Sequence, residues 1–497
     1  MSLKTKTITG ALSTGFGQGV KVVLRLLSIA VLARYLSPED YGLVALVTSI
    51  AGILAIFQEA GLSTAILQKP EVNQIELSSI YWTNVALGFA VFVLTAGFGP
   101  IASRIFDQEL LVYLLPCYGL AAFIRSFTVQ RVTLLQREMK FTELVKADLI
   151  SLVASTVAAI VAAMNGLGVW SLVVMNLSYT LIYNLMVTVY QKWHPDFRYH
   201  HASALPLLRF GASIMGSKLI GRIGESLDAI IVTYFLGVSP AGYYNRAQSI
   251  LNGPMRQIVN PIISVARAGT FRAADERAKL EKAVGLVLTL TSLVCGSIVL
   301  LSFALAYPIV MTLLGPEWAL CVPLFMALAP FALIEPCSSY LTTVLVSRGD
   351  AAALFKWKLF SVTTIVISLF IGLKWGILGV ACSYSLSGLF VRFPLLFAYS
   401  SRKIGIPFLR LMSGVLPSLA VGAPLIAINL IAYLRDQEPG LLQSTLLALV
   451  TMSVYWGAMC FFENTREAVT LLTNRLFQVM PFKPLRRRMQ LAWSRGR

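Results

Sequence analysis

The sequence Tyr35-Leu36-Ser37-Pro38-Glu39-Asp40-Tyr41-Gly42 opens a segment, residues 35–50, that has a second copy at residues 235–250. The two copies are offset by 200 positions without a gap, and both place a leucine, a glycine and a final Ser-Ile pair at equivalent positions. Each copy joins one apolar stretch to the next through a short turn that contains proline. The repeat therefore predicts two halves with the same succession of apolar stretches and turns.

The composition indicates that these apolar stretches lie in a membrane. Hydrophobic residues make up 57% of the 497 residues, charged residues make up only 13%, and the mean hydropathy is +0.74. Alternating segments of about ten residues, typical of a membrane β-barrel, are not visible. Since about 20 apolar residues cross ~30 Å of hydrocarbon as a helix, we expect an all-α polytopic membrane protein with about 14 transmembrane helices.

The predicted spans divide into two lobes and an appendage. They cover residues 12–34, 41–67, 77–98, 110–135, 146–164, 168–190, 208–235, 242–265, 283–306, 318–346, 354–373, 376–398, 408–433 and 441–462. The predicted parts are an N-lobe of six helices at 1–190, a cytoplasmic linker at 191–207, a C-lobe of six helices at 208–400, two further helices at 401–464 and a basic cytoplasmic tail at 465–497. Parallel repeats of this kind are typical of transporters that handle their substrate between the two lobes.

The basic residues indicate the orientation of the chain. The net charge is +18, and when the loops are sorted with the N-terminus inside, lysine and arginine collect in the inside loops. We therefore expect both termini in the cytoplasm and no nucleic-acid partner. Lys21 and Arg25 interrupt the first apolar stretch and no small-residue cleavage site follows, so we expect this stretch to remain in the mature protein.

Cysteine and histidine give little sign of a metal or a cofactor, and none is expected. The six cysteines fall within or at the ends of spans without a Cys-x-x-Cys spacing, which favours small core residues. His194, His200 and His201 lie beside Asp196 in the linker. A metal site there stays open as an alternative, and we favour a solvated linker.

Ionisable residues within spans require a reason, because charge in hydrocarbon is costly. The cationic candidates for substrate binding are Lys21, Arg25, Arg125, Lys218, Arg222 and Arg256. The acidic candidates for ion coupling are Glu59, Glu225, Asp228 and Glu335. Lys21 and Arg25 share one face of the first span, and the four candidates of the seventh span share one face as well. Under the 200-residue offset, Arg25 and Glu225 are equivalent.

The excess of central cations suggests an anionic substrate. The planar fork of arginine can bind two phosphate oxygens at once, so a phosphate-bearing or acidic substrate fits best. A purely structural reading stays open, in which Arg222 with Glu225, or Lys218 with Asp228, forms ion pairs that only hold helices together.

Several ordered segments resemble Wzx-type polysaccharide exporters, in particular their colanic-acid-exporter branch. The segments are Met1-Ser2-Leu3 with Lys6-Thr7-Ile8 and Gly10-Ala11, then Val31-Leu32-Ala33-Arg34, Gly61-Leu62-Ser63, Ile66-Leu67-Gln68-Lys69, Tyr81-Trp82-Thr83-Asn84-Val85, Leu135-Gln136-Arg137-Glu138-Met139-Lys140-Phe141, Leu208-Arg209-Phe210-Gly211-Ala212 and Asn260-Pro261-Ile262. These exporters belong to the multidrug/oligosaccharidyl-lipid/polysaccharide superfamily. The match extends from residue 1 to about residue 410.

The resemblance implies a flippase rather than an enzyme. It implies that undecaprenyl-diphosphate-linked oligosaccharide repeat units cross the bacterial inner membrane, for exopolysaccharide or lipopolysaccharide synthesis, by alternating access of a cationic central cavity. The implied partners are this lipid-linked oligosaccharide, membrane lipids and the polysaccharide polymerase and export machinery. The resemblance supplies no list of site residues.

Four other functions stay open. A drug or cation antiporter of the same superfamily would favour an acidic and aromatic cavity. A flippase for lipid-linked peptidoglycan precursors would share the basic cavity. A glycan polymerase or ligase would carry a large periplasmic loop with catalytic arginine or histidine, whereas the predicted periplasmic loops are short. A scaffold without transport would leave the central charges unexplained.

Overall fold

The computed structural model describes residues 3–59, 66, 72–272, 276–347, 351–436, 438–463 and 465–466, and all the regular elements in this part of the chain are helical. The helices form two compact units. The first comprises Met1–Gln257, Ile309–Leu328 and Ala352–Ser387, and the second comprises Ile258–Pro308, Ala329–Ala351 and Gly388–Arg497. The predicted lobes follow the sequence repeat rather than this division and stay a prediction.

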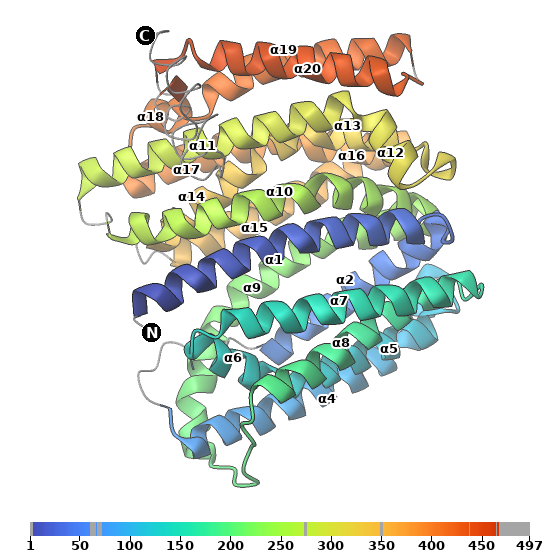
Figure 1. Ribbon diagram of the computed structural model, residues 1–497, viewed down its shortest axis with the longest axis vertical. Helices are drawn as coiled ribbons and strands as arrows, with labels where there is room; N and C mark the ends of the chain where they lie inside the picture. The colour runs from blue at the N-terminus through green and yellow to red at the C-terminus, as the bar shows by residue number, and fades with distance from the viewer. Residues whose placement is uncertain are drawn as a thin grey trace, which may run out of the picture. The chain divides into compact units, whose positions relative to one another are not determined.

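The first unit holds the N-terminal helices of Figure 1. They are α1 (Leu3–Leu32), α2 (Pro38–Glu59), α4 (Gln74–Phe106), α5 (Leu111–Ser126), α6 (Val129–Arg137), α7 (Phe141–Met164), α8 (Trp170–Tyr190) and α9 (His201–Leu236). It also holds the first part of α10 (Val238–Arg272), parts of α12 (Ala306–Leu313) and α13 (Cys321–Ala332), and most of α15 (Ala351–Gly372), together with the short helix η1 (Pro316–Trp318), η2 (Leu373–Trp375) and α16 (Gly376–Ser387).

Helix lengths in the described residues agree with a multi-pass membrane protein. Nine helices are long and apolar enough to cross a membrane, or ten if α5 and α6 together make one bent span. One of the nine, Ala352–Ile404, has 53 residues, which at about 1.5 Å per residue is long enough for two of the predicted spans. The all-α membrane fold is confirmed, and the number of fourteen spans stays a prediction.

The predicted span 110–135 differs from the structure, because α5 and α6 meet at an angle of 42°. The helix breaks at Phe127 and Thr128, where the amide of Thr128 donates to the carbonyl of Arg125 in a tight turn. Phe127 packs against Phe123 with ring centroids 5.1 Å apart. Arg125 therefore lies in the last turn of α5 rather than in the middle of a continuous span.

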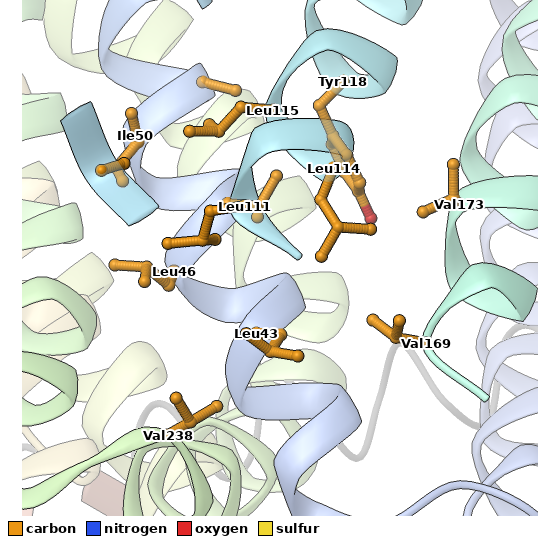
Figure 2. Packing of buried hydrophobic residues seen from close by; sticks show 13 residues of the cluster. Leu43, Leu46, Ile50, Leu111, Leu114, Leu115, Tyr118, Val169, Val173 and Val238 are labelled. Atoms are coloured by element: carbon orange, nitrogen blue, oxygen red, sulfur yellow. The ribbon is translucent and has the colours of Figure 1, made fainter. Parts of the chain in front are cut away.

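A hydrophobic core joins α2, α5 and the start of α8 (Figure 2). Leu43, Leu46 and Ile50 lie on one face of α2 and pack against residues of α5, such as Leu111 and Leu114. The same cluster includes Val238, the first residue of α10. The start of α10 is thus held against the N-terminal helices by apolar contact.

The linker after α8 has no regular secondary structure over residues 191–200, and α9 begins at His201. It lies along the start of α4, because the indole of Trp82 donates to the carbonyl of Asp196 at 2.9 Å and the indole of Trp193 donates to Gln74 at 2.6 Å. The side chain of Phe197 is 91% exposed. The linker is therefore fixed to the N-terminal helices while presenting one aromatic side chain outward.

The second unit holds the remaining helices. They are the end of α10, α11 (Arg277–Ala304), α14 (Glu335–Ser347), the π-helix η3 (Gly388–Arg392), α17 (Phe393–Ile404), α18 (Phe408–Ser413), α19 (Leu416–Arg435) and α20 (Leu441–Met459). Tyr455 of α20 is buried against α11, and its hydroxyl donates to Ser418 of α19 at 3.1 Å. The last two predicted spans thus correspond to a pair of helices that packs on α11.

Candidate functional site

Lys21, a predicted substrate-binding cation, already has an acidic partner in the structure. Its ammonium donates to the carboxylate of Asp148 on α7, and both side chains are largely buried. The hydroxyl of Tyr179 on α8 donates to the second carboxylate oxygen of Asp148 at 2.7 Å. The three residues tie α1, α7 and α8 together, and the charge of Lys21 is neutralised within the protein.

Arg25 and Arg125 differ from Lys21, because neither forms an ion pair with any described residue. Arg25 follows Lys21 by four positions, on the side of α1 that also contains the buried Ser28. Arg125 continues a stripe of α5 in which Tyr118 and Ala121 are buried. Both arginines are nevertheless exposed. The inward faces of α1 and α5 are therefore accessible at these two positions.

Arg222 of α9 lies against α2. One of its nitrogens is 3.4 Å from the carbonyl oxygen of Thr48, and another is 3.3 Å from the carboxylate of Glu225. The absence of a side chain at Gly52 makes room for the guanidinium, which a methyl group there would overlap. The expected ion pair is present, but the side chains of Arg222 and Glu225 are 38% and 60% exposed, so it contributes little stability.

Asp228 is a buried acid of α9 without a cation in contact among the described residues. One carboxylate oxygen accepts the amide of Ala229 at 2.8 Å, and the other accepts the side-chain amide of Gln248 on α10 at 3.3 Å. A buried carboxylate that lacks a cation is stabilised by binding a proton or a metal cation. Its position therefore suits ion coupling.

The other predicted site residues are less informative. Arg256 is exposed on α10, and Glu335 begins α14 in the second unit, where it is half-buried. The side chains of Glu59 and Lys218 lie outside the described residues. Among the described residues, Arg222 and Glu225 are the only two predicted site residues that form an ion pair with each other, since Lys21 pairs with Asp148.

The two copies of the sequence repeat meet at the starts of α2 and α10, in what we name the repeat contact: Pro38, Gly42, Val238 and Gly242. A methyl group on Gly42 would overlap the carbonyl oxygen of Val238, and one on Gly242 would overlap the carbonyl oxygen of Pro38. Each glycine thus contacts, in the other copy, the residue four positions before the equivalent glycine: Gly42 contacts Val238, and Gly242 contacts Pro38. Both helices require glycine here because their backbones touch.

Trp318 of η1 fills the space beside the repeat contact. It is fully buried and packs edge-on against Tyr41 and Tyr243, with ring centroids 5.4 Å and 5.7 Å away. Its indole donates to the carbonyl of Ala33 at 3.2 Å, and the guanidinium of Arg246 lies 3.9 Å from the ring centroid of Tyr41. We name Trp318, Tyr41, Tyr243 and the repeat contact together the sealed end, because the indole is fully buried among them.

The arrangement combines exposed arginines, which lie beside buried residues of α1 and α5, with the aromatic and glycine contacts of the sealed end. The family model described as "Polysaccharide biosynthesis protein" matches residues 31–323. The chain belongs to this family. The resemblance expected from the ordered sequence segments is thereby confirmed, and this polysaccharide biosynthesis protein is a multi-pass membrane protein.

Curated relatives of this polysaccharide biosynthesis protein include three proteins named for polymer synthesis or transport. It is 26% identical over 68% of its length to the "Succinoglycan biosynthesis transport protein ExoT" of Rhizobium meliloti, covering 68% of that protein. It is 23% identical over 78% of its length to the "Lipopolysaccharide biosynthesis protein WzxC" of Escherichia coli, covering 79%. It is 24% identical to the "Teichuronic acid biosynthesis protein TuaB" of Bacillus subtilis, over 78% of this chain and 80% of that one.

Two solved structures with the same fold are named as a flippase and as a multidrug resistance transporter. "Lipid II flippase MurJ, inward closed conformation" superposes with a TM-score of 0.71 at 15% identity, over 92% of this chain and 98% of that one. An inward-facing multidrug resistance transporter of the MATE family superposes with a TM-score of 0.61 at 16% identity, over 77% of this chain and 94% of that one. At this identity the likeness establishes the fold alone.

Sequence reasoning about this polysaccharide biosynthesis protein missed Asp148. An acid only two positions into the predicted span 146–164 was a usable signal, but Asp148 was not included among the ion-coupling candidates. It also missed Lys358 of α15, whose ammonium lies close to Gly221 of α9. The sequence marks Lys358 only as a cation near a span end, and its contact with α9 depends on the packing of helices far apart in the chain.

Proposed function

We propose that this protein flips undecaprenyl-diphosphate-linked oligosaccharide repeat units from the inner to the outer leaflet of a bacterial inner membrane. The observation that carries the proposal is the pair Arg25 and Arg125, accessible on inward helix faces and without acidic partners among the described residues. Cations placed so within a membrane protein require an anionic ligand, and a diphosphate supplies it. The names of the relatives support a polymer precursor as the cargo.

The proposed mechanism is alternating access without a chemical reaction. The diphosphate and the sugars enter from the cytoplasm, where the free arginines bind them, while the polyprenyl chain stays in lipid. The sealed end at the repeat contact and Trp318 separates the bound head group from the periplasm. Opening of that end then releases the head group on the other side.

Complementation tests this function. A strain that lacks its own flippase for an extracellular polysaccharide accumulates lipid-linked repeat units, and the protein is expected to restore export and to clear them. A second candidate function, suggested by the name of the MurJ flippase, is the transport of lipid-linked peptidoglycan precursors. Expression of the protein in a strain depleted of its own flippase for those precursors tests this function. Rescue of growth in that strain without polysaccharide export would replace the proposal.

The orientation with both termini in the cytoplasm can be measured directly. Cysteine at Asp107, exposed at the end of α4, is expected to react from outside with an impermeant thiol reagent. Cysteine at Lys192 in the linker is expected to react only after the membrane is permeabilised. The background lacks the native cysteines, and the opposite labelling pattern would reverse the orientation.

Asp228 is the residue that we propose couples export to an ion gradient. Asparagine can accept the amide of Ala229 and pair with the amide of Gln248, so Asp228→Asn is expected to fold with nearly unchanged thermal stability. Export by this variant is expected to continue at a low rate that no longer changes when the proton or sodium gradient is collapsed. A variant that still responds to the gradient as the wild type does would remove Asp228 from this role.

A further inference from the structure

Helix α8 carries polar and aromatic side chains away from the side on which its apolar residues are exposed. Its exposed apolar residues Leu181, Leu185 and Val189 recur at every fourth position and mark that side. At 100° per residue, Tyr179 and Tyr183 fall on the opposite part of the helix. Both tyrosines are half-buried, so part of each side chain is accessible on the side of α8 opposite these exposed apolar residues.

Tyr179 and Tyr183 form a stacked pair of fixed geometry. Their ring centroids are 5.9 Å apart and their planes differ by 7°. The hydroxyl of Tyr179 is held by Asp148, which is in turn held by Lys21. The ring of Tyr183 packs on one side against the core residues Leu135, Ala147 and Val187. The pair is therefore positioned before any ligand arrives.

Arg125 lies beside this pair. The side-chain amide of Asn184, the residue after Tyr183, donates to the carbonyl of Ile124 at 3.5 Å, so the end of α5 adjoins this part of α8. Arg125, the next residue of α5, is exposed at this junction of α5 and α8. Asp148 is already satisfied by Lys21 and Tyr179, which leaves the exposed guanidinium of Arg125 and the hydroxyl of Tyr183 without a hydrogen-bonding partner among the described residues.

We propose that Tyr179, Tyr183 and Arg125 form a subsite for one acidic sugar residue of the transported oligosaccharide. The face of a pyranose ring carries axial C–H groups, which pack on the electron-rich face of a tyrosine ring. The carboxylate of a uronic acid accepts hydrogen bonds from the planar fork of arginine. Asp148 acts as a positioning residue that fixes Tyr179.

The subsite rests on the proposed function and specifies the cargo. Of the two free arginines, it assigns Arg125 to the sugars and leaves Arg25 for the diphosphate, and it thereby adds a part that selects for glycans with carboxylates. Arg25 follows Lys21 by one helical turn, so the same ion pair that fixes Tyr179 also adjoins an arginine available for the diphosphate.

The test uses the purified full-length protein in detergent and three soluble probes, measured by ligand-observed NMR titration. The probes are cellobiose, cellobiouronic acid, which differs from it by one carboxylate, and inorganic pyrophosphate. We expect cellobiouronic acid to bind at least fivefold more tightly than cellobiose. Arg125→Gln is expected to abolish this preference while leaving the affinity for cellobiose unchanged.

The tyrosines are tested by size-matched and aromatic replacements. Tyr183→Phe is expected to retain at least half of the affinity for both disaccharides, whereas Tyr183→Leu is expected to lower both affinities at least fivefold. Tyr113→Leu and Arg104→Gln are the matched controls, because both residues are exposed on other parts of α5 and α4. Thermal unfolding of every variant separates loss of binding from loss of packing.

Several outcomes would overturn the subsite. One is equal affinity for the two disaccharides in the wild type. Another is an effect of Arg125→Gln on pyrophosphate alone, which would assign the arginine to the diphosphate. A third is a Tyr183→Leu variant that binds normally, or that loses binding and thermal stability together with Tyr183→Phe. If wild-type protein restores polysaccharide export in the complemented strain while any of these holds, the subsite fails and the flippase function stands.

Discussion

Replacing Trp318 with alanine is expected to open the sealed end beside the repeat contact and to reduce polysaccharide export at least tenfold. The indole is fully buried between Tyr41 and Tyr243, and it also donates to the carbonyl of Ala33. Truncation of a buried tryptophan costs ~3–5 kcal/mol. At about 1.4 kcal/mol for each tenfold change, the equilibrium constant for the sealed arrangement would fall by about two to three and a half powers of ten.

The native Cys321 reports this opening. It is buried, and its sulfur lies 3.4 Å from the carbonyl oxygen of Tyr243, close to Trp318. In a protein that retains Cys321 as its single cysteine, we expect Trp318→Ala to make this thiol reactive toward N-ethylmaleimide. Trp375→Ala is the matched control, since this tryptophan is 69% exposed. Trp318→Phe keeps the aromatic packing and is expected to fall between the two.

Normal export by Trp318→Ala with Cys321 still protected would show that the sealed end does not depend on the indole. Loss of the folded protein from the membrane, with Trp318→Phe equally unstable, would instead assign Trp318 to folding.

Replacing Arg25 with alanine is expected to lower export about tenfold to a hundredfold while the protein reaches the membrane in normal amounts. A charge-assisted hydrogen bond contributes ~1.5–3 kcal/mol, which corresponds to this range. Arg25 forms no ion pair with any described residue, so its removal leaves no buried acid behind. Lipid-linked repeat units should accumulate in the cytoplasmic leaflet, where they can be extracted and quantified.

Arg222→Ala is expected to have a similar direction but a smaller effect. Arg222 already donates to Glu225 and to the carbonyl of Thr48, and these bonds compete with the substrate for the guanidinium. Glutamate at either position should impair export more than alanine, and lysine should restore part of it, because the charge returns without the fork. Arg104→Ala, an exposed residue in the last turn of α4, is the control. Export at wild-type levels by Arg25→Ala would refute the assignment of the central cations.

The sequence predicted the helices better than the contacts between them. Apolar length placed a span at 77–98 inside α4 and one at 441–462 over α20, because hydrophobic content is a local property. The bend between α5 and α6 falls at Phe127 and Thr128, where no proline in the sequence predicts a break. Helix boundaries and bends depend on packing against neighbours and so could not be derived from hydropathy.

The candidate site was predicted only in part for the same reason. Periodicity identified Lys21 and Arg25 as members of one helical face, and the structure agrees that they follow each other on α1. It could not show that Asp148, 127 positions away, would neutralise the first and leave the second free. Tertiary contacts decide which predicted cation is available to a ligand. Cations that the sequence could not distinguish therefore differ in their availability.

The repeat contact has a consequence for the origin of the chain. In it, position 42 of one copy meets position 238, and position 242 meets position 38, so each copy offers the same patch to the other. A patch that recognises itself is what a two-fold homodimer requires. A polypeptide that corresponds to one predicted half and carries this patch would pair with a second copy of itself, and fusion of the two genes would preserve the joint while freeing each half to diverge. Lys21, Arg25 and Asp148 belong to one such half, and Arg222, Glu225 and Asp228 to the other.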